Sequence, residues 1–348
     1  MDSARRLFVS IAVVAFGLIG AAAHGAQGVS GKPDPQMQAV LDQLQALGGK
    51  PIESLSAEEA RKQPTPADAV KALLKKQGKS ISPEPVGNVS NRSIPGPGGS
   101  IPIRIYTPQG SGPFPVILYI HGGGWVIADL DVYDSSPRAL ANASGAVVVS
   151  THYRQAPEHK FPAAHDDTYA AYRWVLANAA SIQGDPKRVA VAGESAGGNM
   201  AAAIAIRARD ERVQAPLHQV LIYPVATTSL DTPSKRANTQ AKPLNTAMLG
   251  WFGEKYLPTP ADGEKPTFSI LKANLRSLPP ATVISAQIDP LLSETKDYAD
   301  RLKAAGVPVD YKNYDGVTHE FFGMGAVVDK AKQAVAQAGG NLKKAFAR

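Results

Sequence analysis

Short apolar runs of strand length recur along this chain, and a stretch with helical periodicity follows most of them. The runs are FPVILYIHGGG, GAVVVSTHYR, RVAVAGE, HQVLIYPV and PPATVISAQID. Near-continuous apolar runs of this kind are typical of parallel strands that are buried on both faces of a sheet. Helices are expected over residues 135–143, 162–178, 196–209, 293–305 and 326–346. The alternation predicts an α/β fold, in which helices flank a mostly parallel central sheet.

Segments outside this alternation predict a hairpin and a helical cap. The alternating stretch ISPEPVGNVSNRSIPGPGGSIPIRIYTP contains a Gly/Pro turn and predicts a hairpin. Apolar side chains at three- and four-residue steps predict helices over about 35–47 and 65–77. Residues 226–278 are polar and rich in proline, with one helix expected near 245–256. The expected organisation is a signal peptide over 1–26, N-terminal cap helices over 27–85, and a catalytic domain over 86–348 with a cap insertion at about 226–278.

The first residues have the composition of an export signal. Arg5 and Arg6 precede an apolar run over residues 7–23, and small residues lie at its end. This is the pattern of a secretory signal peptide, and the run is short for a ~20-residue membrane-spanning helix. RRLFV fits a twin-arginine signal, and an ordinary basic start fits equally well. We expect a periplasmic or secreted mature protein with no membrane anchor.

Composition excludes several classes of site. The chain has no cysteine, so thiol nucleophiles, disulfides and thiolate metal sites are excluded. Its net charge of +7 comes from scattered basic residues that are not interleaved with aromatic residues, so no nucleic-acid partner is expected. The stretch His165-Asp166-Asp167 resembles a metal site. Neighbours on a helix point in different directions, however, so we expect a solvated helix start and no metal.

The sequence GESAG lies between a predicted strand and a predicted helix. This is the context of a nucleophile elbow, a sharp turn that gives the serine strained backbone angles and lifts its hydroxyl clear of the sheet. Side chains two positions before and after the serine would clash with the neighbouring strand and helix, which favours glycine at Gly193 and Gly197. Ser195 is therefore the predicted nucleophile, and the alternative is a plain strand-to-helix turn.

A serine nucleophile needs a histidine base and an acid that orients it, and in this type of fold they follow the serine in the order acid, histidine. Asp289 comes directly after a predicted strand, and His319 follows the strand-like run PVDYKNY. His319 is also the one histidine C-terminal to Asp289. The sequence thus predicts Asp289 as the acid and His319 as the base. Glu294 is a weaker candidate acid, and Asp289 could instead cap the following helix.

An acyl-transfer site also needs N–H donors that stabilise negative charge on the substrate oxygen. The glycines of YIHGGGWVIAD leave the backbone bare after a strand. Gly123 and Gly124, together with the amide of Ala196 at a helix start, are therefore predicted to form an oxyanion hole. Glycines after a strand could instead hold phosphate, but neither usual phosphate-loop motif accompanies them.

Five motifs in this order resemble those of the bacterial hormone-sensitive-lipase-like esterases, also called family IV of the α/β-hydrolase superfamily. They are HGGGW, YRQAPEHKFPAAHDD, GESAGGN, DPLLSE and HEFF, and the similarity covers the chain from about residue 35 onward. The resemblance implies the triad and oxyanion hole named above, and it implies that His121 braces the glycine loop. Family members cleave carboxylic esters with short to medium acyl chains, need no cofactor and often form dimers. A small-molecule ester substrate, no cofactor and a homodimer are therefore expected.

Three positions depart from the usual residues of that family. His152 and Gln155 replace an aspartate and a leucine in HYRQAPE, a stretch that is structural in the family. Glu194 stands before the serine, where aspartate or threonine is commoner. Because Glu194 is still a carboxylate, we expect it to support the site.

The sequence leaves two alternatives to a carboxylesterase. The same triad serves amidases and β-lactam hydrolases, and a related plant fold binds a hormone after losing its catalytic histidine. His319 is present here, which disfavours such a receptor. The candidate pocket walls, for which the alternative is packing in the core or cap, are Trp125, Tyr223, Trp251 and Phe252.

Overall fold

One eight-stranded sheet forms the centre of the computed structural model, which describes residues 28–347. The strand order is β1-β2-β4-β3-β5-β6-β7-β8. β1 and β2 pair antiparallel, as do β2 and β4, and all other neighbours are parallel. The strands are β1 (Asn88–Gly96), β2 (Gly99–Thr107), β3 (Phe114–Ile120), β4 (Val147–Thr151), β5 (Gly184–Glu194), β6 (Gln219–Ile222), β7 (Ala281–Ile288) and β8 (Val309–Thr318). The predicted α/β fold is confirmed, and the predicted signal peptide lies outside the described residues.

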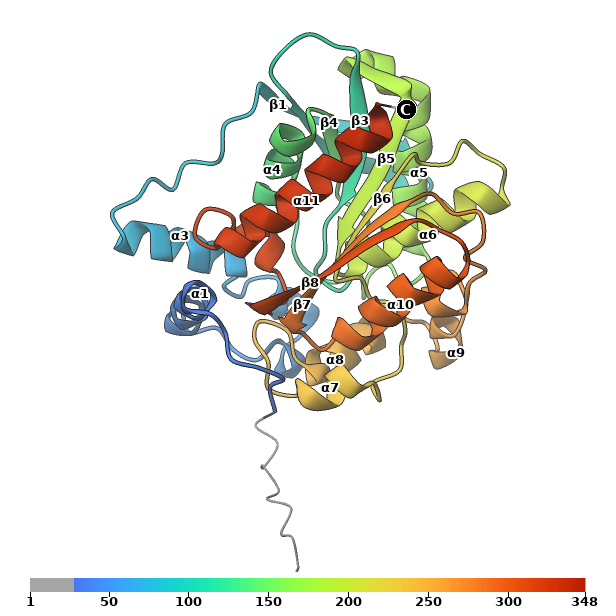
Figure 1. The fold of residues 1–348 in the computed structure, drawn as a ribbon. Helices are drawn as coiled ribbons and strands as arrows, with labels where there is room; N and C mark the ends of the chain where they lie inside the picture. The colour runs from blue at the N-terminus through green and yellow to red at the C-terminus, as the bar shows by residue number, and fades with distance from the viewer. Residues whose placement is uncertain (1–27, 348) are drawn as a thin grey trace, which may run out of the picture.

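Helices cover both faces of this sheet (Figure 1). Successive side chains of a strand point to opposite faces, so Val116 and Leu118 of β3 belong to the apolar core on the side of α5, α6 and α10. Ile117 and Tyr119 pack with α4 and α11 on the other face. The covering helices are α4 (Ser135–Ser144), α5 (Ala163–Asn178), α6 (Ala196–Asp210), α10 (Leu292–Ala304) and α11 (Asp329–Phe346). These two cores explain why the strands read as continuous apolar runs.

The five predicted covering helices agree with the structure, with one shifted boundary. α11 begins at Asp329 rather than 326, because the 3₁₀ helix η4 (Phe321–Met324) and a turn occupy the residues before it. A second 3₁₀ helix, η2 (Ala179–Ile182), joins α5 to β5.

The N-terminal segment and the insertion lie over the carboxyl edge of the sheet (Figure 1). The N-terminal segment contains α1 (Pro35–Ala46), η1 (Ile52–Ser54), α2 (Ala57–Ala60) and α3 (Pro66–Lys76). The insertion contains α7 (Pro233–Ala237), α8 (Thr246–Tyr256), α9 (Pro260–Gly263) and η3 (Ile270–Lys272). α1, α3 and α8 match the predicted helices. α2, α7 and α9 were not predicted, because four or five residues are too few to show helical periodicity.

Side-chain hydrogen bonds join these two segments into one cap. The Trp251 indole Nε1 donates to the Leu55 carbonyl oxygen at 3.1 Å. The Asn245 side-chain amide, whose Oδ1 caps the start of α8, donates to the Glu53 carboxylate at 3.2 Å. Residues separated by 196 and 192 positions in the sequence therefore share one layer over the sheet edge.

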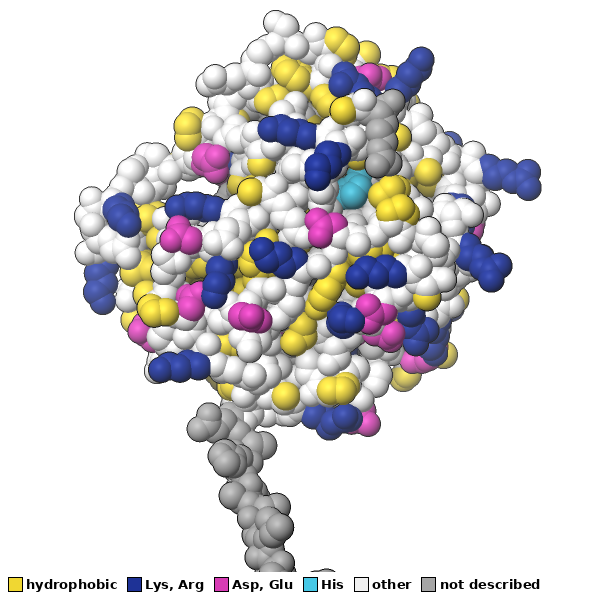
Figure 2. Space-filling model, in the orientation of Figure 1, with side chains coloured by type: hydrophobic (Ala, Val, Ile, Leu, Met, Phe, Trp, Pro, Cys, Tyr) yellow, Lys and Arg dark blue, Asp and Glu magenta, His cyan; other side chains and the backbone are white. Residues whose placement is uncertain are grey.

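The charged side chains of the surface are mixed in sign. On the face in Figure 2, lysines and arginines are scattered with acidic side chains between them. Within residues 28–347, none of the helices combines the length and the apolar character that crossing a membrane would need.

Candidate active site

Ser195 sits at the turn between β5 and α6, with φ 57° and ψ −120°. The turn is so tight that only glycine fits at two of its positions. A Cβ on Gly193 would lie 2.2 Å from the carbonyl oxygen of Gly197, and one on Gly197 would lie 2.0 Å from that of Ile120 in β3. The Ser195 amide donates to the carbonyl oxygen of Ile222 in β6 at 2.9 Å. The backbone of three strands thus fixes where the hydroxyl stands, as the elbow motif predicts.

His319 lies between the serine and an aspartate. Its Nε2 is 2.9 Å from Ser195 Oγ, and its Nδ1 is 2.7 Å from Asp289 Oδ2. Asp289 follows β7 and His319 follows β8, so parallel strand ends bring all three side chains to one edge, where all are buried. The other oxygen of Asp289 accepts the Leu291 amide at 2.8 Å, so this carboxylate both contacts His319 and caps the turn into α10.

The hydrogen bonds determine the tautomer of His319. A carboxylate only accepts, so Nδ1 carries the proton, and the bare Nε2 accepts from the Ser195 hydroxyl. Burial disfavours the charged imidazolium, but the Asp289 carboxylate, with the negative charges of Glu320 and Glu194, outweighs burial and raises the pKa of His319. The geometry is that of a nucleophile, a base and an orienting acid.

The glycine loop presents free amides beside the serine. Gly123 and Gly124 have φ of 92° and 59° and line a cavity with Ser195. Among residues 28–347, no group accepts a hydrogen bond from either amide. The Ala196 amide belongs to the first turn of α6, where backbone N–H groups lack partners within the helix. The structure therefore brings the three predicted oxyanion donors to the serine.

Comparison with known proteins supports this reading of the fold. Residues 117–323 match a family described as the alpha/beta hydrolase fold. The chain belongs to this family. The ethyl acetate hydrolase of Pseudomonas putida is 35% identical over 311 residues, which cover 87% of this chain and 96% of that protein. A carboxylesterase of Mycobacterium tuberculosis is 40% identical over 258 residues, which cover 71% of this chain and 79% of that protein.

Solved structures of esterases have a similar fold. A thermostable esterase from Pseudomonas putida has a TM-score of 0.83 and 35% sequence identity. The match covers 90% of this chain and 98% of the chain of that esterase. A hyperthermophilic esterase from Pyrobaculum calidifontis has a TM-score of 0.81 and 37% identity, with coverage of 90% and 98%. The family resemblance predicted from five motifs is confirmed.

Two carboxylates of this α/β-hydrolase lie near His319, the buried Glu194 and the partly exposed Glu320. Glu194 accepts hydrogen bonds from the hydroxyls of Tyr119 and Tyr223, the first at 2.6 Å. Burial, with repulsion from Glu320, raises the pKa of Glu194 to about 7. Sequence reasoning included Glu194 but missed Glu320. The signal that could have found Glu320 is its position directly after the predicted base.

Glu320 reaches toward the reacting side of the imidazole. Its Oε1 lies 3.8 Å from His319 Nε2 and accepts the Tyr133 hydroxyl at 2.6 Å. Burial raises the pKa of Glu320 above its ordinary value, although the neighbouring His319 and the Tyr133 hydroxyl offset part of this rise. Its side chain keeps 20% of its surface exposed, so solvent reaches this carboxylate.

His121 braces the glycine loop through its neighbours. Its Nδ1 donates to the Gly122 carbonyl oxygen at 2.8 Å, so its Nε2 accepts from His152 Nδ1 at 3.2 Å. The Tyr153 hydroxyl donates to the same Gly122 oxygen at 2.9 Å. Burial, with repulsion from His152, lowers the pKa of His121 to about 3, which keeps this ring neutral.

The unusual Gln155 holds the same loop from its other end. Its side-chain amide donates to the carbonyl oxygens of Ile127 at 2.9 Å and Ala128 at 2.8 Å. His152 and Gln155, the two departures in HYRQAPE, are therefore both packed into the wall of the site.

His165 lies in the first turn of α5, as predicted, but the prediction that this helix start is solvated is wrong. Its ring is buried and bonds to the Tyr256 hydroxyl at 2.8 Å and to Asn199 Oδ1 at 3.0 Å. Asp167 is also buried and accepts two hydrogen bonds from the guanidinium of Arg154. Over residues 28–347, no cluster of three or more His, Cys, Asp or Glu is arranged to hold a metal ion.

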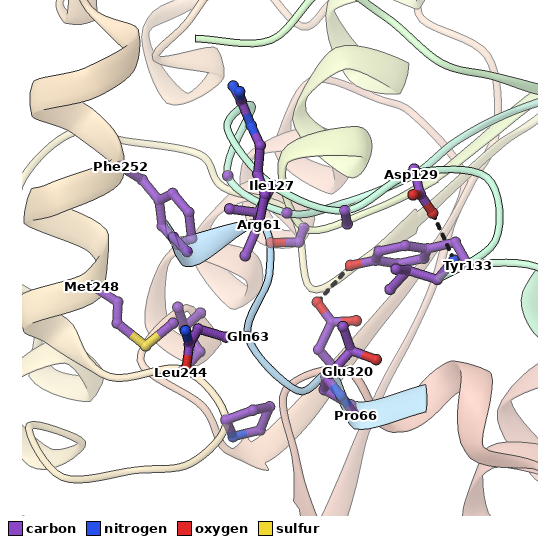
Figure 3. A pocket seen from close by; sticks show the side chains of 18 of the residues that line it. Arg61, Gln63, Pro66, Ile127, Asp129, Tyr133, Leu244, Met248, Phe252 and Glu320 are labelled. Carbon is purple, nitrogen blue, oxygen red and sulfur yellow. Dashed lines mark hydrogen bonds between the residues drawn. The ribbon is translucent and has the colours of Figure 1, made fainter. Parts of the chain in front are cut away.

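Two cavities meet at Ser195. We call the first the His319 cavity; it measures about 240 Å³, and His319 and Glu320 line it (Figure 3). We call the second the Trp125 cavity; it measures about 630 Å³, and Trp125 and other apolar side chains line it together with threonine, lysine and glutamate side chains. Phe252 of α8 lines both, close enough to the glycine loop that a Cβ on Gly124 would lie 2.2 Å from its ring.

Trp125 and Phe252 line cavities, as the sequence predicts, but Tyr223 and Trp251 lie outside both. The Tyr223 ring packs against His319, with centroids 4.4 Å apart, and its hydroxyl is used by Glu194. Trp251 packs edge-on against Phe252 and holds the N-terminal cap segment. The difference arises because aromatic residues next to a site can support its walls without forming them.

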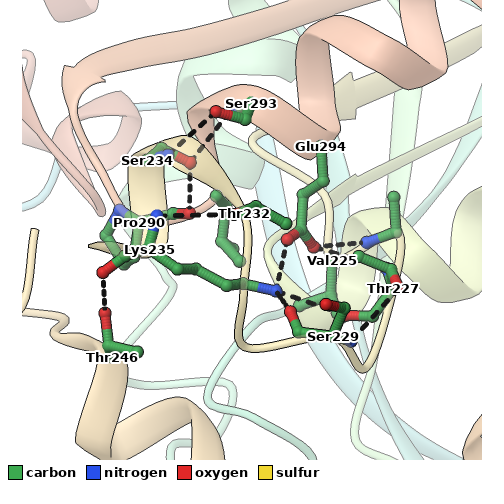
Figure 4. A network of polar contacts seen from close by, with 12 residues as sticks. Val225, Thr227, Ser229, Thr232, Ser234, Lys235, Thr246, Pro290, Ser293 and Glu294 are labelled. Atoms are coloured by element: carbon green, nitrogen blue, oxygen red, sulfur yellow. Dashed lines mark hydrogen bonds and ion pairs between the residues drawn. The ribbon is translucent and has the colours of Figure 1, made fainter. Parts of the chain in front are cut away.

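Glu294, the weaker candidate acid, belongs to a separate buried network (Figure 4). Its carboxylate pairs with the Lys235 ammonium and accepts the Ala226 amide at 2.8 Å. Lys235 Nζ also donates to the Ser229 carbonyl oxygen at 2.7 Å. The ion pair joins α7 of the cap to α10, and both side chains are almost fully buried. Glu294 is thus engaged away from His319.

Proposed function

We propose that this chain is a carboxylic ester hydrolase that forms an acyl-enzyme on Ser195. The observation that carries the proposal is the continuous chain of hydrogen bonds from Ser195 Oγ through His319 to Asp289, at 2.9 and 2.7 Å. The names of the relatives, which are hydrolases of ethyl acetate and other carboxylic esters, support the reaction class.

In the first step, His319 Nε2 takes the Ser195 proton as the hydroxyl oxygen attacks the ester carbonyl. Negative charge then develops on the carbonyl oxygen, where the amides of Gly123, Gly124 and Ala196 can donate to it. Asp289 holds the proton on Nδ1 and stabilises the imidazolium. The imidazolium gives its Nε2 proton to the leaving alkoxide, and the acyl group stays on the serine.

In the second step, a water molecule replaces the alcohol. His319 takes a proton from this water as its oxygen attacks the acyl carbonyl. The Ser195 oxygen leaves and takes the proton back, which releases the carboxylic acid. The raised pKa of His319 makes the imidazolium easier to form as each attack proceeds.

The two cavities divide the substrate between them. The leaving alkoxide must lie near His319 to receive its proton, so the alcohol part belongs in the His319 cavity. The acyl part then belongs in the Trp125 cavity, which is larger and does not include His319. Leu249, Leu257 and Phe268 add apolar surface there, which suits acyl chains of short to medium length.

The test combines covalent labelling with a substrate series. A fluorophosphonate probe should label the wild-type protein on Ser195 and leave Ser195→Ala unlabelled. Turnover of p-nitrophenyl esters from acetate to laurate should pass through a maximum at short to medium chain length. Faster hydrolysis of matched anilides or of nitrocefin would contradict an ester substrate, and absence of labelling would contradict the acyl-enzyme.

We also propose that the protein is exported without a membrane anchor and forms a homodimer. The basic and apolar pattern of residues 1–26 and the family resemblance support these proposals. Fractionation of a cell that expresses the full chain tests the first, and light scattering of the purified protein tests the second.

A further inference from the structure

The His319 cavity has one acidic wall. Glu320 lies deep in it beside His319, and Asp129 lies at its exposed edge, with Tyr133 between them (Figure 3). Glu320 accepts one hydrogen bond, from the Tyr133 hydroxyl. Asp129 Oδ1 accepts the amides of Asp131 and Val132, both at 2.9 Å. Among the described residues, neither carboxylate is paired with a lysine or arginine. No lysine or arginine among the described residues therefore neutralises this wall.

The positively charged side chain of this cavity, Arg61, already has partners of its own. Among the described residues that line this cavity, Arg61 alone has a lysine or arginine side chain. Its guanidinium makes two hydrogen bonds to the Glu158 carboxylate, at 2.8 and 2.7 Å. It also donates to the carbonyl oxygens of Ala156 and Val126, both at 2.8 Å. Arg61 is thus engaged by these oxygens, and Figure 3 shows its side chain apart from Glu320.

The wall opposite the two carboxylates is mostly apolar, with the Gln63 side chain beside Leu244 (Figure 3). Leu244 and the α8 residues Met248 and Phe252 face Glu320 across the cavity (Figure 3). A group that fills this space meets hydrocarbon on one side and a carboxylate on the other. An alkylammonium group satisfies both surfaces, because its methyl groups are apolar and its charge is positive.

We propose that the His319 cavity selects esters whose alcohol carries a cationic ammonium group, and that Glu320 is the residue that determines this selectivity. The inference rests on the proposed ester hydrolysis, which places the leaving oxygen at His319 Nε2. Glu320 Oε1 is 3.8 Å from that nitrogen. An ammonium two carbons from the leaving oxygen therefore comes within reach of the carboxylate. Tyr133 positions Glu320 through its hydrogen bond.

The test compares two acetates of the same shape and different charge. 3,3-Dimethylbutyl acetate has a neutral carbon where acetylcholine has its positively charged nitrogen. The kcat/KM for acetylcholine divided by that for 3,3-dimethylbutyl acetate therefore measures selectivity for charge. Glu320→Gln should lower the acetylcholine to dimethylbutyl ratio by about five- to tenfold, because a partly buried carboxylate at short range is lost. Asp129→Asn should lower it by less than about threefold, because solvent screens an exposed charge. Asp131→Asn is the matched control, since this exposed carboxylate pairs with Arg104 and lies outside the cavity.

A second ester pair tests the placement of the alcohol. The ethyl esters of betaine and of 3,3-dimethylbutanoic acid carry the same difference in charge on the acyl side. Their ratio should stay within about twofold in Glu320→Gln, because the acyl part occupies the other cavity. An unchanged acetylcholine ratio in Glu320→Gln, or a fall confined to the acyl-side pair, would overturn the proposal.

A measurement on the wild-type protein avoids any folding defect of a variant. Choline should inhibit hydrolysis of dimethylbutyl acetate more strongly than 3,3-dimethylbutanol does, and equal inhibition would overturn the proposal. Failure of the underlying function would look different, because neither acetate would then be hydrolysed by the wild-type protein.

Discussion

The sheet edge and the cap position their side chains in different ways. At the sheet edge, Ser195, Asp289 and His319 follow three strands whose register is set by backbone hydrogen bonds. In the cap, positions depend on side-chain contacts such as Trp251 with Leu55 and Lys235 with Glu294. The difference suggests that the sheet edge determines the reaction and the cap determines which ester reaches it.

The largest expected effect tests the sheet edge. Ser195→Ala removes the nucleophile and should lower kcat by about 10⁶-fold, as in other serine triads. Thermal unfolding should be nearly unchanged, because the Ser195 side chain contributes one hydrogen bond and the glycines define the turn. Activity of the purified variant within a hundredfold of wild type would contradict the assignment of Ser195.

The next effect tests whether the cap depends on its buried ion pair. Lys235→Met leaves the Glu294 carboxylate without its cation in a dry site, which should reduce the free energy of unfolding by about 3–5 kcal/mol. Urea denaturation measures the loss. Lys272→Met breaks an ion pair with Glu264 that is half exposed and should change stability little. Equal stability of the two variants would show that the buried pair does not hold the cap.

A smaller effect tests the cap as the source of selectivity. Phe252→Ala removes the side chain that lines both cavities. The kcat/KM for branched or long esters, divided by that for the acetate ester, should rise by about tenfold, because more space opens beside Ser195. Trp251→Phe, next to it but outside both cavities, is the control. A similar change in both variants would mean that the effect is general loosening of the cap.

The smallest effect concerns pH. His319 accepts a proton only when its Nε2 is bare, so activity is lost as pH falls through its raised pKa. The acid limb of kcat/KM should therefore lie above the ordinary imidazole value of about 6.5. Glu194→Gln removes a negative charge that favours the imidazolium, so the limb should move to lower pH by less than about one unit. Glu58→Gln on the exposed cap surface should leave the limb unchanged, and a shift to higher pH in Glu194→Gln would contradict the electrostatic argument.

The contrast also explains how far the sequence could be interpreted. Gly193 and Gly197 could be recognised because the clashes that require them come from backbone a few residues away or from the adjacent strand. His165 was misjudged because its partners, Tyr256 and Asn199, are 91 and 34 positions away. Trp251 was misjudged for the same reason, and Glu320 was overlooked because its role depends on a cavity that the cap completes. Local rules predict the elements, whereas these contacts depend on how distant segments pack.

The joint construction of the cap has a consequence for engineering. Trp251 and Asn245 of one segment hold Leu55 and Glu53 of the other. A chimaera that exchanges only residues 226–278 with a relative would leave the donor helix without the surface against which it evolved. Transplanting substrate preference between such enzymes should therefore require both pieces together, even though they are encoded far apart.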